Sequence, residues 1–575
     1  MKDRNNLMIS YGMVMILLLS LTPYVSADGQ QEEPAYAFLP SWNGTISGNL
    51  DPSGENYEDD FSNHDYDQYG NLYYLQTEDY GTWMGDQYIN GAGYHIMKIN
   101  IDGQVEYIER LACYRYCTSA DNPYNKVISI EVVEEDQFYI LISTYRNMVS
   151  IGGTYYGSTG YSNTLITAFY SNGTWSWVED ATTSTYSYSD IVHIETDSQS
   201  NLFVVQFEQN SGSWRDFSIT SYSPNGTNWI RTLSLPNTEY SNAIFDVEGT
   251  NIHALITASN QYKYDSQSVQ CNNLGEENYC YSWMTVNQNG VRTSSVSTPY
   301  ASIDFKEMEI FNNSLYLSGN TYDPVVGSNT ESNFTGQKIS HSPKYGQYVA
   351  IMNNNGTWDL HINVNKVSTS YRNYYQISDV LDDGSMVFNA LYDGTMFIDG
   401  RQITSSTNTD FDFVNLRIKP DHGVLWSSPI GINNPSTFDY KPKGDGSTIA
   451  FIMSKTSTTE LFYNYSIDSN YNQSNLVNGN YIFWVDADDG KIVDIEPTAG
   501  IDVYSRSPEG GVLTSNYGSM YYYMPDFDGD NVGTGDNCPE TYNPTQSDYN
   551  NNGFGDACDV DDDSDGVEDV SDLCP

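Results

Sequence analysis

Positive charge is scarce in this sequence. Of its 575 residues, 24 are Lys or Arg and 75 are Asp or Glu, which gives a formal net charge of −51. Nucleic acids and anionic lipids bind proteins through basic faces, so the charge argues against both as partners. Aromatic residues remain frequent, at 14% of the chain with 50 Tyr. This combination is typical of a folded soluble protein, and also of adaptation to salty surroundings.

Common catalytic motifs are missing as well. The sequence has no His-Glu-x-x-His, no Gly-x-Ser-x-Gly and no Gly-Lys-Ser/Thr phosphate loop, and its seven His are scattered. We therefore expect a binding protein and not an enzyme. The alternative is an extracellular carbohydrate-active enzyme, sialidase-like or lyase-like, whose acidic, Arg and Tyr residues gather in space without a signal in the sequence.

Long apolar runs are absent beyond residue 27. Lys2 and Arg4 precede the apolar stretch 7–21, and Val25-Ser26-Ala27 offers small residues for cleavage. The run is shorter than a comfortable membrane span, which favours a removed secretory signal over a retained anchor. We expect residues 1–27 to be a signal peptide and the mature chain, as given, to be secreted or at the cell surface without direct membrane insertion.

Cysteine is rare, with seven residues. Cys113 lies four residues before Cys117, and Cys271 and Cys280 bracket a polar hairpin tip. In an oxidising compartment these pairs would form short-loop disulfides. Zinc is the competing use, but neither pair has a nearby His or a second Cys pair at zinc-site spacing. The sequence predicts disulfides at both places.

Short apolar runs repeatedly lead into an Asn-Gly or Asp-Gly pair and continue toward an aromatic residue, as in Phe169 to Trp175. Such pairs suit tight β-hairpins, because glycine readily adopts positive φ. Related turns occur at Asp102-Gly103, Asn172-Gly173, Asn225-Gly226, Asn289-Gly290, Asn355-Gly356, His422-Gly423 and Asp489-Gly490. A second hairpin signal, a small polar turn before a β-forming run, alternates with these near residues 70, 136, 200, 250, 313, 384, 446 and 511.

Two hairpins per unit, at a period of about 50 to 70 residues, indicate four-stranded units repeated around an axis, which is the pattern of a β-propeller. Continuous apolar runs such as 138–142, 202–205 and 449–453 fit strands that are buried on both faces. We predict an all-β propeller over residues 28–524, with eight blades favoured and seven possible. We interpret the following residues as packing between blades: Trp175, Trp177, Trp229, Trp358 and Trp426.

The last repeat, near residues 501–524, lacks an outer Asn-Gly turn, whereas Asn43-Gly44-Thr45 repeats that turn near the start of the chain. A propeller must join its first and last blades to avoid open strand edges. We therefore predict that residues 36–48 pair with a strand near 518–524 and close the last blade.

Composition changes abruptly at Asp526. From there to Pro575 the chain has 15 Asp plus Glu, no Lys, Arg or His, and too few apolar side chains for a core. Oxygen donors recur at alternate positions before a glycine, as in loops that wrap Ca²⁺. We predict these calcium ligands: Asp526, Asp528, Asp530, Asp536, Asp548, Asn550, Asn552, Asp556, Asp559, Asp561, Asp563, Asp565, Asp569 and Asp572.

Residues 526–575 resemble thrombospondin type 3 repeats. The resemblance rests on Asn537-Cys538-Pro539, on residues 548–558 and on Asp561-x-Asp563-x-Asp565-Gly566. In that family each repeat binds calcium and successive cysteines pair, which implies a disulfide between Cys538 and Cys558. The first repeat departs from the pattern, because it is one residue short and has Asn531 where glycine is usual.

Cys574 is left without a partner one residue before the end of the sequence. The family's cysteine spacing would place another cysteine further along, so we predict that residues 525–575 belong to a calcium-binding segment that continues beyond Pro575.

Residues 63–524 resemble extracellular propeller repeats of bacteria and archaea in their Gly-Asn-Leu-Tyr and Asn-Gly-Thr-Trp elements. Together the two resemblances imply an extracellular calcium-binding protein whose propeller recognises an extracellular protein or glycan, in adhesion or recognition. A structural surface spacer is a further alternative.

Overall fold

The structure is a computed structural model. It describes the strands and adjoining turns between residues 46 and 523, with gaps at loops, and then residues 528, 530, 532, 537, 538, 541–550 and 554–562. The chain divides into two units, Ser41–Asp536 on the one hand and Asn537–Pro575 with Met1–Pro40 on the other. All regular elements among the described residues are β-strands, which confirms the all-β prediction. The described part contains no helix long and apolar enough to span a bilayer.

Four-stranded antiparallel sheets recur along the unit Ser41–Asp536. Within the described residues, eight sheets share a set of four antiparallel strands, and three of these sheets carry two further strands. The first four sheets, from the central strand outward, are β2 (His64–Tyr66), β3 (Leu72–Glu78), β6 (Gly93–Ile99), β7 (Val105–Tyr114); β8 (Lys126–Glu134), β9 (Gln137–Tyr145), β12 (Ser162–Tyr170), β13 (Trp175–Asp180); β14 (Asp190–Thr196), β15 (Leu202–Glu208), β16 (Trp214–Ser223), β17 (Gly226–Pro236); and β18 (Asn242–Glu248), β19 (Asn251–Ser259), β22 (Tyr279–Val286), β23 (Arg292–Pro299).

The next four sheets repeat this plan. They are β24 (Ile303–Phe311), β25 (Ser314–Thr321), β28 (Gln347–Asn353), β29 (Trp358–Lys366); β30 (Tyr375–Val380), β31 (Met386–Asp393), β34 (Phe411–Lys419), β35 (Gly423–Gly431); β36 (Lys443–Gly444), β37 (Thr448–Lys455), β38 (Gly479–Asp486), β39 (Ile492–Thr498); and β40 (Asp502–Arg506), β41 (Val512–Asn516), β42 (Ser519–Tyr523), β1 (Ile46–Ser47).

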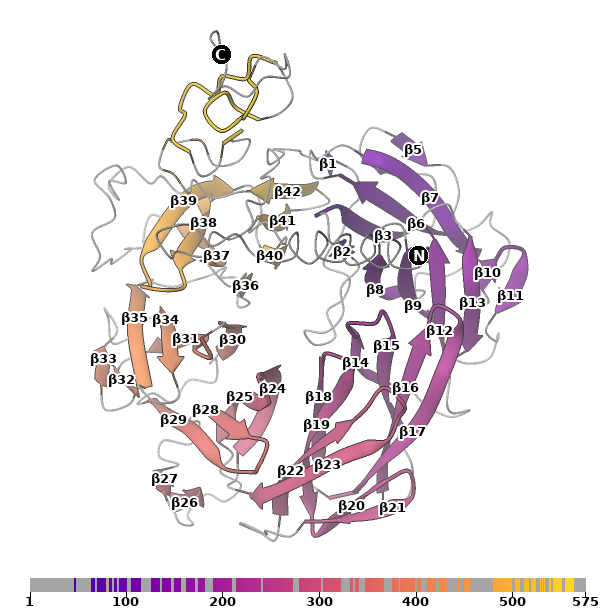
Figure 1. Ribbon diagram of the computed structural model, residues 1–575, viewed down its shortest axis with the longest axis vertical. Helices are drawn as coiled ribbons and strands as arrows, with labels where there is room; N and C mark the ends of the chain where they lie inside the picture. The colour runs from indigo at the N-terminus through magenta and orange to yellow at the C-terminus, as the bar shows by residue number, and fades with distance from the viewer. Residues whose placement is uncertain are drawn as a thin grey trace, which may run out of the picture. The chain divides into compact units, whose positions relative to one another are not determined.

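The sheets are arranged around a common axis (Figure 1). The first strands of consecutive sheets contact one another, from β2 with β8 through β14, β18, β24, β30 and β36 to β40. Sheets that radiate from a ring of inner strands form a β-propeller, so the predicted architecture is confirmed.

One sheet combines strands from the two ends of the unit. The short strand β1 pairs with β42, with Ile46 opposite Met520 and Ser47 opposite Ser519. This is the pairing expected from the displaced Asn43-Gly44-Thr45 turn. It covers the edge of β42 that would otherwise be open to another strand.

Apolar second strands build the cores between sheets. Phe138, Ile140, Phe203 and Val205 are at most 1% exposed. They belong to two clusters, each of which joins side chains of two adjacent sheets. Burying one such side chain is worth about 1.5 to 3 kcal/mol, so each sheet is stabilised mainly by its neighbours.

Tryptophans at the outer turns link neighbouring sheets. Trp177 Nε1 donates to the Ser223 carbonyl at 3.0 Å, and Trp229 Nε1 donates to the Gln288 carbonyl at 2.7 Å. The second contact requires glycine at position 290, where φ is +69° and a Cβ would lie 2.7 Å from the Trp229 ring. The predicted packing of tryptophans between blades is confirmed for these two residues. The side chain of Trp426 lies outside the described residues.

Hairpins inserted between second and third strands are a feature that the sequence did not predict. The described ones are β4 (Thr82–Met84) with β5 (Gln87–Ile89), β10 (Val149–Ile151) with β11 (Thr154–Tyr156), β20 (Gln261–Tyr264) with β21 (Gln267–Gln270), β26 (Glu331–Phe334) with β27 (Gln337–Ser340), and β32 (Thr395–Ile398) with β33 (Arg401–Thr404). Three of them add two strands to the preceding sheet, through β7, β17 and β29. Each of these three hairpins therefore connects its own sheet to the preceding one, and we call these three hairpins straps.

Candidate metal centre and inner ring

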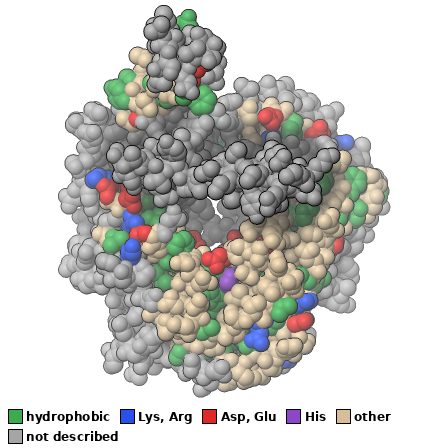
Figure 2. Space-filling view, in the orientation of Figure 1, with side chains coloured by type: hydrophobic (Ala, Val, Ile, Leu, Met, Phe, Trp, Pro, Cys, Tyr) green, Lys and Arg blue, Asp and Glu red, His purple; other side chains and the backbone are tan. Residues whose placement is uncertain are grey.

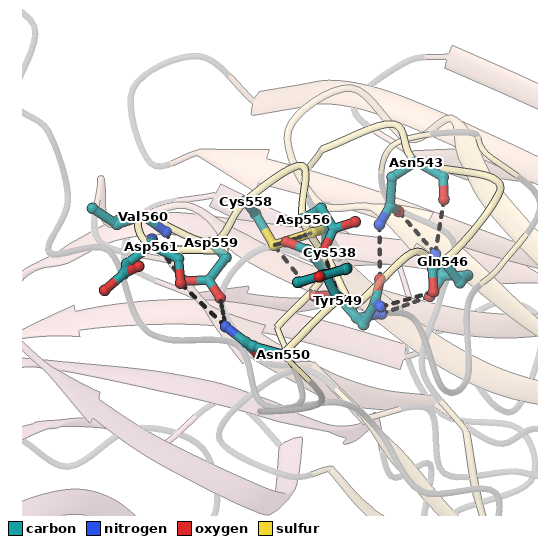
Figure 3. The surroundings of a disulfide bond; sticks show 12 residues. Cys538, Asn543, Gln546, Tyr549, Asn550, Asp556, Cys558, Asp559, Val560 and Asp561 are labelled. Carbon is teal, nitrogen blue, oxygen red and sulfur yellow. Dashed lines mark hydrogen bonds between the residues drawn. A yellow bond between two sulfur atoms is a disulfide. The ribbon is translucent and has the colours of Figure 1, made fainter. Parts of the chain in front are cut away.

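A disulfide and a network of amides organise the described C-terminal residues (Figure 3). Cys538 and Cys558 form the predicted disulfide, with their Cα atoms 5.7 Å apart. The Asn543 amide donates to Asn537 Oδ1 at 2.7 Å, and the Gln546 amide donates to Asn543 Oδ1 at 2.8 Å. Gly555 lies against this network, where an added Cβ would be 2.4 Å from Asn537 Oδ1. Polar contacts and a covalent bond thus take the place of an apolar core here.

Three of the predicted calcium ligands come together next to the disulfide. The Asn550 amide nitrogen donates to Asp559 Oδ2 at 2.9 Å and to the Asp561 carbonyl at 3.1 Å (Figure 3). Asp559 Oδ1 in turn accepts from the Val560 and Asp561 backbone N–H groups. Two oxygens therefore converge on the partial positive charge of an amide. Hard oxygen donors in such a loop are the ligands that Ca²⁺ prefers.

Other predicted calcium ligands accept hydrogen bonds from backbone N–H groups. Asp556 accepts hydrogen bonds from the Ser547 hydroxyl and from the Tyr549 backbone N–H. Asp528 and Asp530 each accept from a backbone N–H two residues further along. The described residues contain no group of three or more His, Cys, Asp or Glu side chains placed to hold a metal ion.

Several predicted residues lie outside the described part of the chain. They are the signal segment 1–27, Asp526, Asp536, Asn552, Asp563, Asp565, Asp569, Asp572, Cys574, and the side chains of Cys113 and Cys117. The second predicted disulfide of the propeller is present, between Cys271 and Cys280.

The inner strands carry an acidic repeat that the sequence analysis missed. In six consecutive sheets an acidic residue of the first strand lies opposite the second or third residue of the next strand: Asp65 opposite Tyr73, Glu131 opposite Tyr139, Glu195 opposite Phe203, Asp246 opposite His253, Glu309 opposite Tyr316, and Asp379 opposite Val387. Gly444 and Ser505 hold this position in the other two sheets. We call the six acidic residues the inner ring. Aligning the inner hairpins would have revealed it.

Carboxylates of the inner ring bridge neighbouring sheets. Asp65 Oδ2 accepts from the Val132 N–H at 2.7 Å, and Glu195 Oε2 accepts from the Val247 N–H at 3.0 Å. His193 Nε2 lies 3.1 Å from the same Glu195 oxygen. Acidic side chains border the central opening of the propeller (Figure 2).

Burial dominates the electrostatics of the inner ring. It raises the pKa of Asp65 to about 6, although the hydrogen bonds that this side chain accepts act to lower the pKa. Burial, together with the Glu195 charge, raises the pKa of Asp246 to about 8. The pKa of Glu131 is raised by burial and then by the neighbouring charges of Asp65 and Glu195. Acids on adjoining strands therefore hold their protons at a pH where exposed carboxylates have lost them.

Comparison with known proteins agrees with this division of the chain. The thrombospondin type 3 repeat family matches residues 547–575. Thrombospondin-2 of Mus musculus is 56% identical over 39 residues, which are 7% of this chain and 3% of that protein. A thrombospondin type 3 repeat segment thus follows the propeller in the sequence, and the expected resemblance is confirmed.

Solved structures similar to the propeller are distant. A quinohemoprotein alcohol dehydrogenase from Pseudomonas putida HK5 has a TM-score of 0.37 at 9% identity, covering 84% of this chain and 71% of that one. A cobalt-substituted Synechocystis ACO has a TM-score of 0.34 at 10% identity, covering 80% and 95%. The polysaccharide lyase Uly1 has a TM-score of 0.28 at 10% identity, covering 90% and 92%. Scores this low support no conclusion about activity.

Proposed function

We propose that this is an extracellular calcium-binding protein whose propeller recognises a ligand outside the cell. The convergence of Asp559 and Asp561 oxygens on the Asn550 amide carries the calcium part. A half-turn of that amide would present Oδ1 to the same point and add a third oxygen ligand. The remaining predicted ligands of this loop are Asp563, Asp565, Asp569 and Asp572.

Bound calcium would also stabilise residues 526–575, which have little else to hold them folded. The 15 acidic residues of this segment lack balancing cations, and its few apolar groups do not offset a chain entropy of about 1 to 2 kcal/mol per residue. A bound divalent ion removes the repulsion, so that binding free energy becomes folding free energy. The propeller, with its own cores, does not depend on the ion.

Calcium titration of the full chain tests this proposal. We expect binding at about 10⁻⁴ to 10⁻³ M, with protection of residues 537–575 from protease. Asp559→Asn, which removes the converging carboxylate, should weaken binding about tenfold, whereas the nearby Asp562→Asn is the matched control. A segment that is cleaved equally fast with and without millimolar calcium would contradict the proposal.

The count of eight blades belongs to the proposal as well. Its support is the eight-fold recurrence of a four-stranded sheet and the unbroken series of contacts between first strands from β2 to β40. An experimental structure with six or seven repeats around the axis would overturn it.

The recognition function rests on the propeller scaffold, on its predicted export and on the thrombospondin type 3 repeats beside it in the sequence. An extracellular protein or glycan is the proposed partner. An array of glycans and extracellular proteins, probed with the full chain with and without calcium, should give a binder that survives the loss of calcium. The enzyme alternative calls for Arg, Glu and Tyr gathered at one mouth of the propeller.

A further inference from the structure

The inner ring joins neighbouring sheets at the point where they come closest. Asp65 reaches from β2 to the backbone of β8, and Glu195 reaches from β14 to the backbone of β18. Glu307, two residues before the ring position of β24, repeats this contact by accepting from the Ile377 N–H of β30 at 3.1 Å. The same type of contact therefore occurs at three junctions between sheets.

Acids interact with one another along the inner strands β2, β8, β14, β18 and β24. Glu131 interacts electrostatically with Asp65 on one side and Glu195 on the other, and Asp246 interacts with Glu195 and Glu309. Asp67 adds a further negative charge beside Asp65. His193 is the group that can supply positive charge to both Glu131 and Asp246.

We propose that the inner ring is a proton-operated latch, which holds the inner strands of five consecutive sheets together when Asp65, Glu131 and Asp246 are protonated and loosens them when these three acids ionise. Protonated carboxyl groups still accept the backbone hydrogen bonds between sheets, and they do so without mutual repulsion. Ionised groups on adjoining strands repel one another in a half-buried place where water screens them poorly.

The direction of the pH effect follows from linkage. A carboxyl group whose folded pKa is raised stabilises the fold fully below its unfolded pKa, and this contribution is lost as pH rises through the folded pKa. For Asp65 the pH window runs from the ordinary aspartate pKa of 3.8 to the folded pKa of about 6, and for Asp246 it runs from 3.8 to about 8. The propeller should therefore be more stable in acid than at mildly alkaline pH.

Thermal unfolding of the full chain at constant millimolar calcium, from about pH 5 to about pH 9, tests the latch. The melting temperature of the wild-type propeller should fall by roughly 3 to 8 °C across this range. Asp246→Asn copies the protonated acid, so it should raise the melting temperature at the alkaline end and remove much of the slope. Asp265→Asn, at a carboxylate 61% exposed in the β20–β21 turn, is the matched control and should keep the wild-type slope.

Asp65→Asn is the second variant, and it keeps the test decisive if Asp246→Asn does not fold. This variant should reduce the fall of the melting temperature with pH, mainly below about pH 7. A wild-type melting temperature that is constant or rises across the range would overturn the latch. So would a slope that neither variant changes.

Discussion

At the scale of single residues, Arg417 shows how a chain with little positive charge uses one buried cation. Its guanidinium donates to the Ser385 hydroxyl at 2.7 Å and to Asp488 Oδ1 at 2.6 Å, and lies 3.2 Å from Asp383 Oδ2. Burial opposes the charge of Asp383, but hydrogen bonds from Lys419 and Ser385 and the Arg417 charge hold its pKa well below the usual range. Asp383 and Asp488 lie in turns of successive sheets, so Arg417 fastens the two sheets together.

Arg417→Met should lower the free energy of unfolding by about 2 to 4 kcal/mol, because it removes the donor that binds the buried Ser385 hydroxyl and the Ala487 carbonyl at this junction. Urea denaturation followed by tryptophan fluorescence measures the loss. Lys419→Met is the control, since Lys419 binds Asp383 from a more exposed position and should cost less than about 1 kcal/mol. Equal losses in both variants would contradict the role assigned to Arg417.

At the scale of elements, the strap β20–β21 is the best-defined addition to the repeat. It pairs with β17 through Leu233 and Tyr264, and Tyr262, Tyr264 and Val269 are buried in the core of two sheets. The Cys271–Cys280 disulfide ties the end of this strap to β22. The strap is thus held by the packing of its buried side chains and by the disulfide at Cys271, directly after β21.

Replacing both Cys271 and Cys280 by Ser should release the base of the strap. Loss of a short loop closure is worth about 2 to 3 kcal/mol, so protease cleavage within residues 261–279 should become faster in the native state. Mass spectrometry of the fragments locates the cuts. The matched control replaces Cys538 and Cys558 and should leave the strap protected; cleavage of the strap at equal rates in both variants would argue against the disulfide's role.

At the scale of the whole propeller unit, closure depends on β1. The strand is short, but it completes the sheet of β40, β41 and β42. Without it, β42 would present an unpaired edge to solvent or to another chain.

Deleting residues 28–50 should therefore lower the melting temperature by roughly 5 °C and promote concentration-dependent association through β42. Calorimetry and sedimentation velocity measure the two effects. Deleting only residues 28–40, which keeps Ile46–Ser47, is the control. A propeller that melts as before and stays monomeric without β1 would show that the closure is dispensable.

Much of the fold could be predicted because its signals are local. Asn-Gly turns, apolar second strands and the displaced Asn43-Gly44-Thr45 turn each act within a few residues, and their period reveals the repeat. The thrombospondin type 3 segment was equally accessible, because its ligands and cysteines follow one another at fixed spacing. The straps escaped prediction, since their short strands have no periodic signal and pair with a strand of the preceding sheet.

By itself, the sequence determined an all-β propeller with a joined last sheet, the Cys271–Cys280 and Cys538–Cys558 disulfides, and a calcium-type acidic segment, because hairpins, short disulfides and ligand loops are local in the chain. Only the tertiary structure revealed the inner ring and the Arg417 junction. Asp65, Glu131, Glu195 and Asp246 are more than 50 residues apart in most pairs, and single acids so spaced look like solvated surface. Their proximity, and with it their raised pKa values, arises only when strand register and blade packing place them around one axis.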